Sequence, residues 1–440
     1  MERNKVYDKP PVPNSPSAPD GPKRETDEAK EICRVPPNGG VQAWLCVVGG
    51  FCCQFCSFGF VNACGAFQLY YETDLLKNYS SSAISWIVTI QIFLMFFLGT
   101  VTGILVDAVG PRPVVAAAGF LSLLGICMLS LCKENWQIIL AQRICFGTGA
   151  AGLFLPSMVA VGQWFSTKKG LAMGIVASGS SVGGTIFPIM VPRLIRQHEF
   201  PAMIRWVALL IGILIGVAIV CVTGPFPPRG REKKASSGLA AYKSLTWLFF
   251  LLGCFFIVWG LFGPFDYMPL MAISHGMSEN LSTYTVAITN ACSIFGRVIP
   301  GYLSDKMGQL NIMMVVGILS GVSILCFWLP LEYYFSNAGI LVFGGLYGAI
   351  SGGFIGLMTP CVIALSDGNV EALGARLGGF MVVLAIASLT GLPIMGAIDG
   401  SQANQSYTGL IIYSGVVMTL GGAFITAARL RRNGLRLEKV

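Results

Sequence analysis

The sequence predicts an all-α membrane protein in which twelve transmembrane helices form two pseudo-symmetric six-helix bundles. Of the 440 residues, 54% are hydrophobic and only 11% are charged, a balance typical of membrane proteins rather than of soluble domains. Twelve apolar stretches are long enough to cross about 30 Å of hydrocarbon. One short motif also recurs roughly 200 residues further along the chain, which indicates an internal duplication.

The first 40 residues differ from the rest of the chain. They mix Lys, Arg, Asp and Glu with several prolines and contain too few apolar residues to bury a core, so we predict a disordered cytosolic tail over 1–40. They also lack the apolar core of a signal peptide. The first helix is therefore expected to act as its own insertion signal.

Six apolar stretches follow and define a first bundle over residues 41–224. They lie at about 43–69, 83–106, 113–132, 136–160, 169–192 and 203–224. Residues 225–245 then combine Pro, Gly and Ser with a run of basic residues, which favours a cytosolic linker over a further span.

Six more apolar stretches define a second bundle over residues 246–428, followed by a short basic tail at 429–440. They lie at about 246–271, 281–303, 311–330, 338–365, 372–397 and 408–428.

An even number of spans places both termini on one side of the membrane. That side would carry twenty-two Lys and Arg residues against five on the other, so the positive-inside rule predicts that both termini are cytoplasmic. We expect the plasma membrane.

Three N-x-S/T sequences fall in segments predicted to lie on the outer side. They begin at Asn78, Asn280 and Asn404 and are candidate glycosylation sites.

The repeated motif forms a short turn in each half of the chain. GILVDAVGPR at 103–112 and GYLSDKMGQ at 301–309 share Gly, Leu, Asp and Gly at equal spacing. A carboxylate at Asp107 or Asp305 can bond the N-terminus of a neighbouring helix and the local basic residue, Arg112 or Lys306. We predict that these four residues gate the cytoplasmic side; the alternative is a solvated short loop.

Two arginines lie inside predicted spans. Arg297 precedes Asp305 by eight residues, or roughly 12 Å of helix, and a charge at that depth costs at least a few kcal/mol unless it is paired or faces water. Arg297 is therefore the main candidate for binding an acidic oxygen of a solute. Arg143 lies in the fourth span, and the sequence leaves a structural and a coupling role equally open.

Uncharged polar residues accompany Arg297. Asn290 and Ser293 lie on the same predicted span, and Asn62 lies on the first span. All three could offer neutral hydrogen bonds to a solute, although such residues more often bond another helix.

No enzyme chemistry is indicated. The fourteen cysteines mostly lie in apolar stretches and there are only two histidines, which argues against a metal site. The sequence contains no nucleophile elbow and no P-loop, and we expect no cofactor. We interpret the net charge of +8 as a topology signal rather than as a sign of nucleic-acid binding.

Several motifs of the sequence resemble those of a known family. The doubled G-x-L-x-D-x-x-G turn resembles the signature loop of the major facilitator superfamily. NGGVQAW at 38–44 and WFSTKKGLAMGIVASG at 164–179 are similar to motifs of its monocarboxylate porter branch, with fungal-type members nearest. GRVIPGYLSD at 296–305 resembles the eighth span of that branch, and the resemblance implies that Arg297 is the substrate-binding arginine.

Three residues depart from the pattern of that branch. Asn38 stands where an Asp is usual, Ser293 where proton-coupled members have an Asp, and Asn62 where they have a Lys. The resemblance therefore implies an anion site at Arg297 but leaves proton coupling open.

The sequence thus predicts a carrier of a small carboxylate-type solute that works by alternating access. One alternative is an efflux carrier that exports an acidic secondary metabolite, and a lower alternative is a solute sensor that does not transport. The expected partners are a small organic anion or secondary metabolite, the lipid bilayer and, if transport is coupled, protons, but not nucleic acid.

Overall fold

The computed structural model describes residues 36–62, 81–227, 244–366, 373–400 and 406–434. Nearly all of the predicted tail at 1–40, most of the predicted linker, and Asn78 and Asn404 lie outside the described residues. The boundaries of the two predicted bundles therefore stay a prediction.

The first six membrane-length segments are all helical. They are α1 (Val41–Gln54) continued by the π-helical turn η2 (Phe55–Gly59), α3 (Ser81–Val109), α4 (Pro111–Leu129), α5 (Asn135–Ile138) continued by η4 (Ile139–Cys145) and α6 (Phe146–Trp164), α7 (Lys169–Gln197), and α8 (Phe200–Cys221).

The last six segments are helical as well. They are α10 (Leu245–Leu261) with α11 (Gly263–Ser274), α12 (Glu279–Met307), α13 (Gln309–Ser323) with η6 (Ile324–Trp328) and α14 (Leu329–Tyr333), α15 (Asn337–Leu365), α16 (Leu373–Gly400), and α17 (Thr408–Asn433). The described residues contain no strand, so the predicted all-α fold is confirmed.

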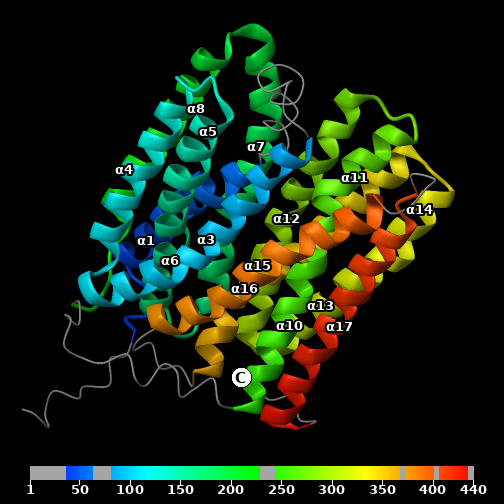
Figure 1. Cartoon of the computed structure of the whole chain (residues 1–440). Coiled ribbons are helices and arrows are strands. Elements are labelled where there is room, and N and C mark those ends of the chain that lie inside the picture. The colour runs from blue at the N-terminus through cyan, green and yellow to red at the C-terminus, as the bar shows by residue number, and fades with distance from the viewer. Residues whose placement is uncertain (1–35, 63–80, 228–243, 367–372, 401–405, 435–440) are drawn as a thin grey trace, which may run out of the picture. The chain divides into compact units, whose positions relative to one another are not determined.

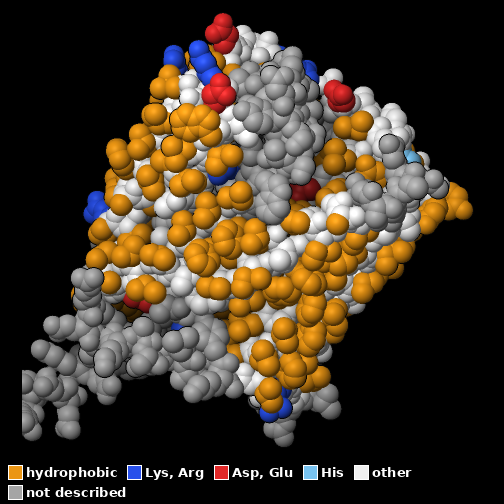
Figure 2. Space-filling model, viewed as in Figure 1, with side chains coloured by type: hydrophobic (Ala, Val, Ile, Leu, Met, Phe, Trp, Pro, Cys, Tyr) orange, Lys and Arg blue, Asp and Glu red, His pale blue; other side chains and the backbone are white. Residues whose placement is uncertain are grey.

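Eleven of these segments in the described chain are long and apolar enough to cross a membrane, and the twelfth is α12. Hydrophobic side chains cover the visible outer face of the helices (Figure 2), as expected where the surface contacts lipid instead of water.

Two helix pairs make most of the contacts between the first six segments and the last six. α7 packs against α12, and α3 packs against α16 (Figure 1). Close packing in a membrane requires small residues. A Cβ on Gly170 of α7 would lie 2.3 Å from the carbonyl oxygen of Gly301 on α12, and a Cβ on Gly374 of α16 would lie 2.1 Å from that of Gly103 on α3.

The two ends of the described chain lie at one end of the molecule. Near the beginning, the Asn38 amide donates to the carbonyl of Trp164, just before α7. Near the end, Arg429 of α17 donates to Asn311, just after α12. We call this end, which also holds Asp107 and Asp305, the aspartate end.

Candidate solute-binding site

α12 is the most polar of the long helices, and its polar residues face inward. The buried members are Ser282, Thr285, Thr289, Asn290, Ser293, Arg297 and Ser304. Such a helix is poorly suited to contact lipid, since uncompensated polar groups in hydrocarbon are costly. It is instead enclosed by α7, α15, α11 and α13, which places its polar face in the middle of the protein.

Arg297 is only 3% exposed and is held by neutral oxygen atoms. Its Nε donates to Ser293 Oγ one helical turn earlier at 3.2 Å. Its Nη1 donates to the Ala177 carbonyl and to the Ser180 hydroxyl, both on α7. Nη2 forms no hydrogen bond to any described residue, so two of the five guanidinium N–H groups are available to a solute.

Ser293 connects this arginine to a second serine of α7. Ser181 Oγ donates to Ser293 Oγ at 3.2 Å, and both side chains are buried. The serine that stands where the resemblance leads one to expect an aspartate therefore bonds Arg297 as a neutral group.

Asn62 and Asn290 form a neutral pair between the end of the first helical segment and α12. Asn62 Nδ2 donates to Asn290 Oδ1 at 3.3 Å, and Asn290 Nδ2 donates to the Val286 carbonyl at 3.0 Å. A Cβ on Gly184 of α7 would lie 2.6 Å from both side-chain amides. A larger residue at this position would force at least one of the two amides to shift.

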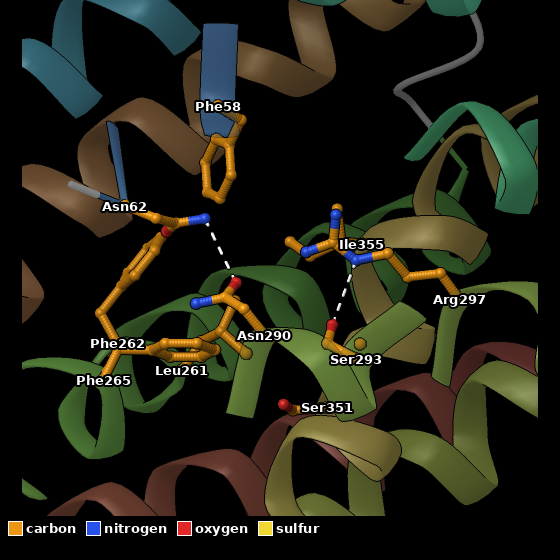
Figure 3. A pocket seen from close by; sticks show the side chains of 11 residues that line it. Phe58, Asn62, Leu261, Phe262, Phe265, Asn290, Ser293, Arg297, Ser351 and Ile355 are labelled. Carbon is orange, nitrogen blue, oxygen red and sulfur yellow. Dashed lines mark hydrogen bonds between the residues drawn. The ribbon is translucent and has the colours of Figure 1, made fainter. Parts of the chain in front are cut away.

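All four predicted binding residues line one pocket, in which about 340 Å³ is not filled by atoms, including the space at its opening. Figure 3 shows them as two hydrogen-bonded pairs, Asn62 with Asn290 and Ser293 with Arg297, next to each other along the pocket. The remaining lining residues are mostly apolar: Phe58, Leu261, Phe262, Phe265, Ser351, Gly352 and Ile355. The pocket thus combines one cation and several neutral polar groups with a mostly apolar wall that includes three phenylalanines.

The two aspartates of the repeated motif each bond the N-terminus of a helix from the other half. Asp305 accepts from the backbone amides of Gly170 and Leu171 at 2.8 and 2.9 Å. Asp107 accepts from the amide of Gly374 at 3.2 Å. A carboxylate is favoured at a helix N-terminus, where amide groups lack helical partners.

The last glycine of each repeated motif ends a helix. Gly110 follows α3 with φ of 89°, and Gly308 follows α12 with φ of 94°, a region that favours glycine.

The two basic residues of the motifs make other contacts. Arg112 Nε donates to the Ile219 carbonyl at 3.0 Å, and Lys306 Nζ lies 4.4 Å from the centre of the Tyr302 ring.

α7 and α12 are also tied at the opposite end. Arg193 donates to the Tyr284 hydroxyl at 3.1 Å, and Arg196 donates to Asn280 Oδ1 at 2.8 Å. Asn280, one of the three candidate glycosylation sites, therefore contacts α7. Arg297 lies between these two tied ends.

Arg143 does not line the pocket. It lies in η4, is 1% exposed, and its Nη1 donates to Gln91 Oε1 of α3. This bond joins two segments of the first half. Among the described residues, no group of three or more His, Cys, Asp or Glu could hold a metal ion.

Sequence reasoning missed Ser180, Ser181 and the three phenylalanines of the pocket wall. The two serines lie in the glycine-rich stretch of α7, where the small residues indicated packing alone. A weak signal was present, because hydroxyls at adjacent positions on a buried helix require partners. Phe58, Phe262 and Phe265 cannot be told from other core aromatics without the helix arrangement.

In the described residues, eleven candidate membrane spans and α12 surround a buried polar pocket that is lined from both halves. This arrangement is typical of a solute carrier. Comparison with known proteins is in agreement: residues 49–392 match the family model of the Major Facilitator Superfamily. The chain belongs to this superfamily.

Fungal relatives cover nearly the whole chain. The MFS-type transporter hasB of Aspergillus fumigatus is 50% identical, covering 93% of this chain and 94% of its own. The fujikurins efflux protein of Gibberella fujikuroi is 37% identical over 94% and 88%. The solved structure of the human organic anion transporter MFSD10 superposes with a TM-score of 0.67 over 88% of this chain and 100% of its own; at 10% identity it shows the fold alone.

Proposed function

We propose that the protein is an efflux carrier that exports an acidic secondary metabolite by alternating access. The 37% identical relative named as the fujikurins efflux protein supports export. The pocket supports an acidic solute with an apolar framework, because the Arg297 guanidinium lines the same pocket as Phe58, Phe262 and Phe265.

The observation that carries the proposal is the state of Arg297. The guanidinium is buried, lines the pocket, and keeps Nη2 without a hydrogen bond to the described chain. A carboxylate or similarly acidic oxygen would satisfy those donors and form charge-assisted bonds. Asn62, Asn290 and Ser293 would supply neutral hydrogen bonds beside it.

Alternating access would use the contacts at the two ends of α7 and α12. Asp305 and Asp107 would close the aspartate end, which we take as cytoplasmic, together with Arg112 and Lys306 at the adjoining turns. Arg193 and Arg196 would close the opposite end. Breaking one set of contacts while the other holds would expose the pocket to one side at a time.

Uptake of a small monocarboxylate is the second candidate, supported by the motifs that resemble the monocarboxylate porter branch and by Arg297. The apolar part of the wall favours a solute with an apolar framework. Among the described lining residues, Arg297 alone is titratable, and none of them offers a carboxylate for proton coupling. This favours a facilitative exporter over an obligatory proton symporter.

Deletion of the gene tests the direction of transport. Metabolites are compared by mass spectrometry in cells and in culture medium, with and without the protein. Export predicts that an acidic metabolite accumulates in cells of the deletion strain and falls in the medium, and that the intact gene restores it. A carboxylate that is instead depleted in cells and left in the medium indicates uptake and overturns the proposal.

A further inference from the structure

The interface between α7 and α12 supplies Arg297 with protein partners from the opposite half. Ser180 Oγ and the Ala177 carbonyl both accept from Nη1, and Ser180 also donates to that carbonyl at 2.9 Å. With the Ser293 contact at Nε, three of the five guanidinium N–H groups are bonded to the carrier's own oxygen atoms.

The two partners of Arg297 on α7 lie in the α7–α12 interface, which is held by hydrogen bonds at both of its ends. Asp305 bonds the first turn of α7 at the aspartate end, and Arg196 bonds Asn280 at the other. The arrangement in which Ser180 holds Arg297 is therefore one in which α7 and α12 are closed along their whole length. A carrier must pass through such an arrangement between its two orientations.

The partners of a buried charge decide whether a carrier can adopt the closed arrangement of α7 and α12 without solute. An unsatisfied guanidinium in the membrane interior costs several kcal/mol. If only the solute could satisfy it, the carrier would reorient only with solute bound and would exchange one molecule for another. If the opposite half supplies oxygen atoms, the carrier can also close without solute.

We propose that Ser180 is the residue that lets this carrier return without solute, so that it performs net export and not obligatory exchange. The proposal rests on the role of Arg297 proposed above. An entering acidic group bonds the guanidinium first at Nη2 and then also at Nη1, where it replaces Ser180 as α7 and α12 separate. When the solute leaves, Ser180 accepts from Nη1 again. Ser180 is thus a positioning residue that acts through Arg297.

Ser180→Ala separates the two transport modes. Proteoliposomes are loaded with an extract of culture medium from cells grown on ¹³C-glucose, and the acidic metabolite that requires the gene is followed by mass spectrometry. Efflux into plain buffer measures net transport, while efflux into buffer with unlabelled extract measures exchange. Losing one hydrogen bond to a charged group predicts net efflux about tenfold slower, with exchange within about twofold of the wild type.

Two further variants make the test specific. Ser180→Thr keeps a hydroxyl and should restore net efflux. Ser178→Ala is the matched control, because Ser178 is buried on the same helix and, among the described residues, bonds the Ile175 carbonyl of its own helix alone. Both modes should be unchanged. Equal loss of both modes in Ser180→Ala, or loss of neither, overturns the proposal. Absence of any efflux by the wild type overturns the proposed function itself.

Discussion

The α7–α12 and α3–α16 interfaces share one design at the aspartate end. In each, a glycine four residues before the aspartate packs against a glycine in the first turn of the partner helix. The pairs are Gly301 with Gly170 and Gly103 with Gly374. In each, the aspartate then accepts from an amide of that same turn. The two interfaces therefore close this end by the same contacts.

The middles of the two interfaces differ. Counted back from the aspartate, Arg297 and Ser293 of α12 correspond to Gly99 and Met95 of α3. Counted forward from the first-turn glycine, Ser180 and Ser181 of α7 correspond to Leu384 and Ala385 of α16, which are both buried. The second interface thus carries apolar residues where the first carries its charge and hydroxyls.

This difference indicates that closure of the aspartate end and binding of the solute depend on different residues. Both interfaces close by glycine packing and an aspartate at a helix N-terminus, since both must close for one end of the protein to be sealed. Only α7–α12 positions a charge beside the pocket. Solute binding would thus act directly on one interface, and the other would follow because the same halves meet there.

The largest expected effect comes from the charge itself. Arg297→Ala removes a buried, hydrogen-bonded cation, a loss of about 3 kcal/mol in binding or roughly a hundredfold. Export measured in a complemented deletion strain should fall to the level of the deletion, while the amount of protein at the cell surface persists.

Gly99→Ala is the matched control in the other interface. Its Cβ would lie 3.5 Å from the nearest side-chain atom, Met381 Cγ, which is an ordinary contact, so export should stay close to that of the wild type. Undiminished export by Arg297→Ala would show that the charge binds no solute.

A smaller effect is expected when either aspartate loses its charge. Asp305→Asn weakens bonds to the amides of Gly170 and Leu171, at a cost of about 2 kcal/mol. Because both interfaces join the same two halves at the same end, hydrogen exchange should rise roughly tenfold or more in the first turns of both α7 and α16. Asp107→Asn should do the same.

The amide of Leu281 at the start of α12 is the internal reference for that experiment. It bonds Ser278 at the opposite end and should exchange at the wild-type rate. Faster exchange confined to the substituted interface would mean that α7–α12 and α3–α16 open independently.

Much of this fold was predictable because the membrane requires it. Every backbone polar group in lipid must be bonded within its own helix, so apolar stretches of sufficient length predict helices. The repeated motif was equally informative, because Gly103, Asp107 and their counterparts each have a role that few other residues can fill. Arg297 stood out because a charge is rare at that depth.

The partners of these residues could not be predicted from the sequence. Ser180 lies over a hundred residues from Arg297, and the pairing of Asp305 with α7 depends on which helices of the two halves are neighbours. Periodicity shows that a residue faces inward but not what it meets there. The sequence predicted bonds from the aspartates to helix N-termini and to the local basic residues Arg112 and Lys306. In the structure the aspartates accept from the amides of Gly170 and Gly374 in the other half, whereas Arg112 and Lys306 make other contacts.

The smallest expected effect concerns the neutral pair at the edge of the pocket. Asn62→Ala removes a hydrogen bond to Asn290 of 3.3 Å, while Asn290 keeps its bond to the Val286 carbonyl. A neutral bond contributes about 1 kcal/mol, so the KM for efflux from proteoliposomes should rise roughly fivefold with the maximal rate unchanged. The counterpart of Asn290 on α3 is the buried Ile92, so Asn290→Ile, which makes α12 resemble α3 at this position, should have a similar effect. If Asn62→Ala instead abolished export as Arg297→Ala should, the pair would be as essential to binding as the charge, and the contrast between the two interfaces would extend beyond Arg297 and its serines.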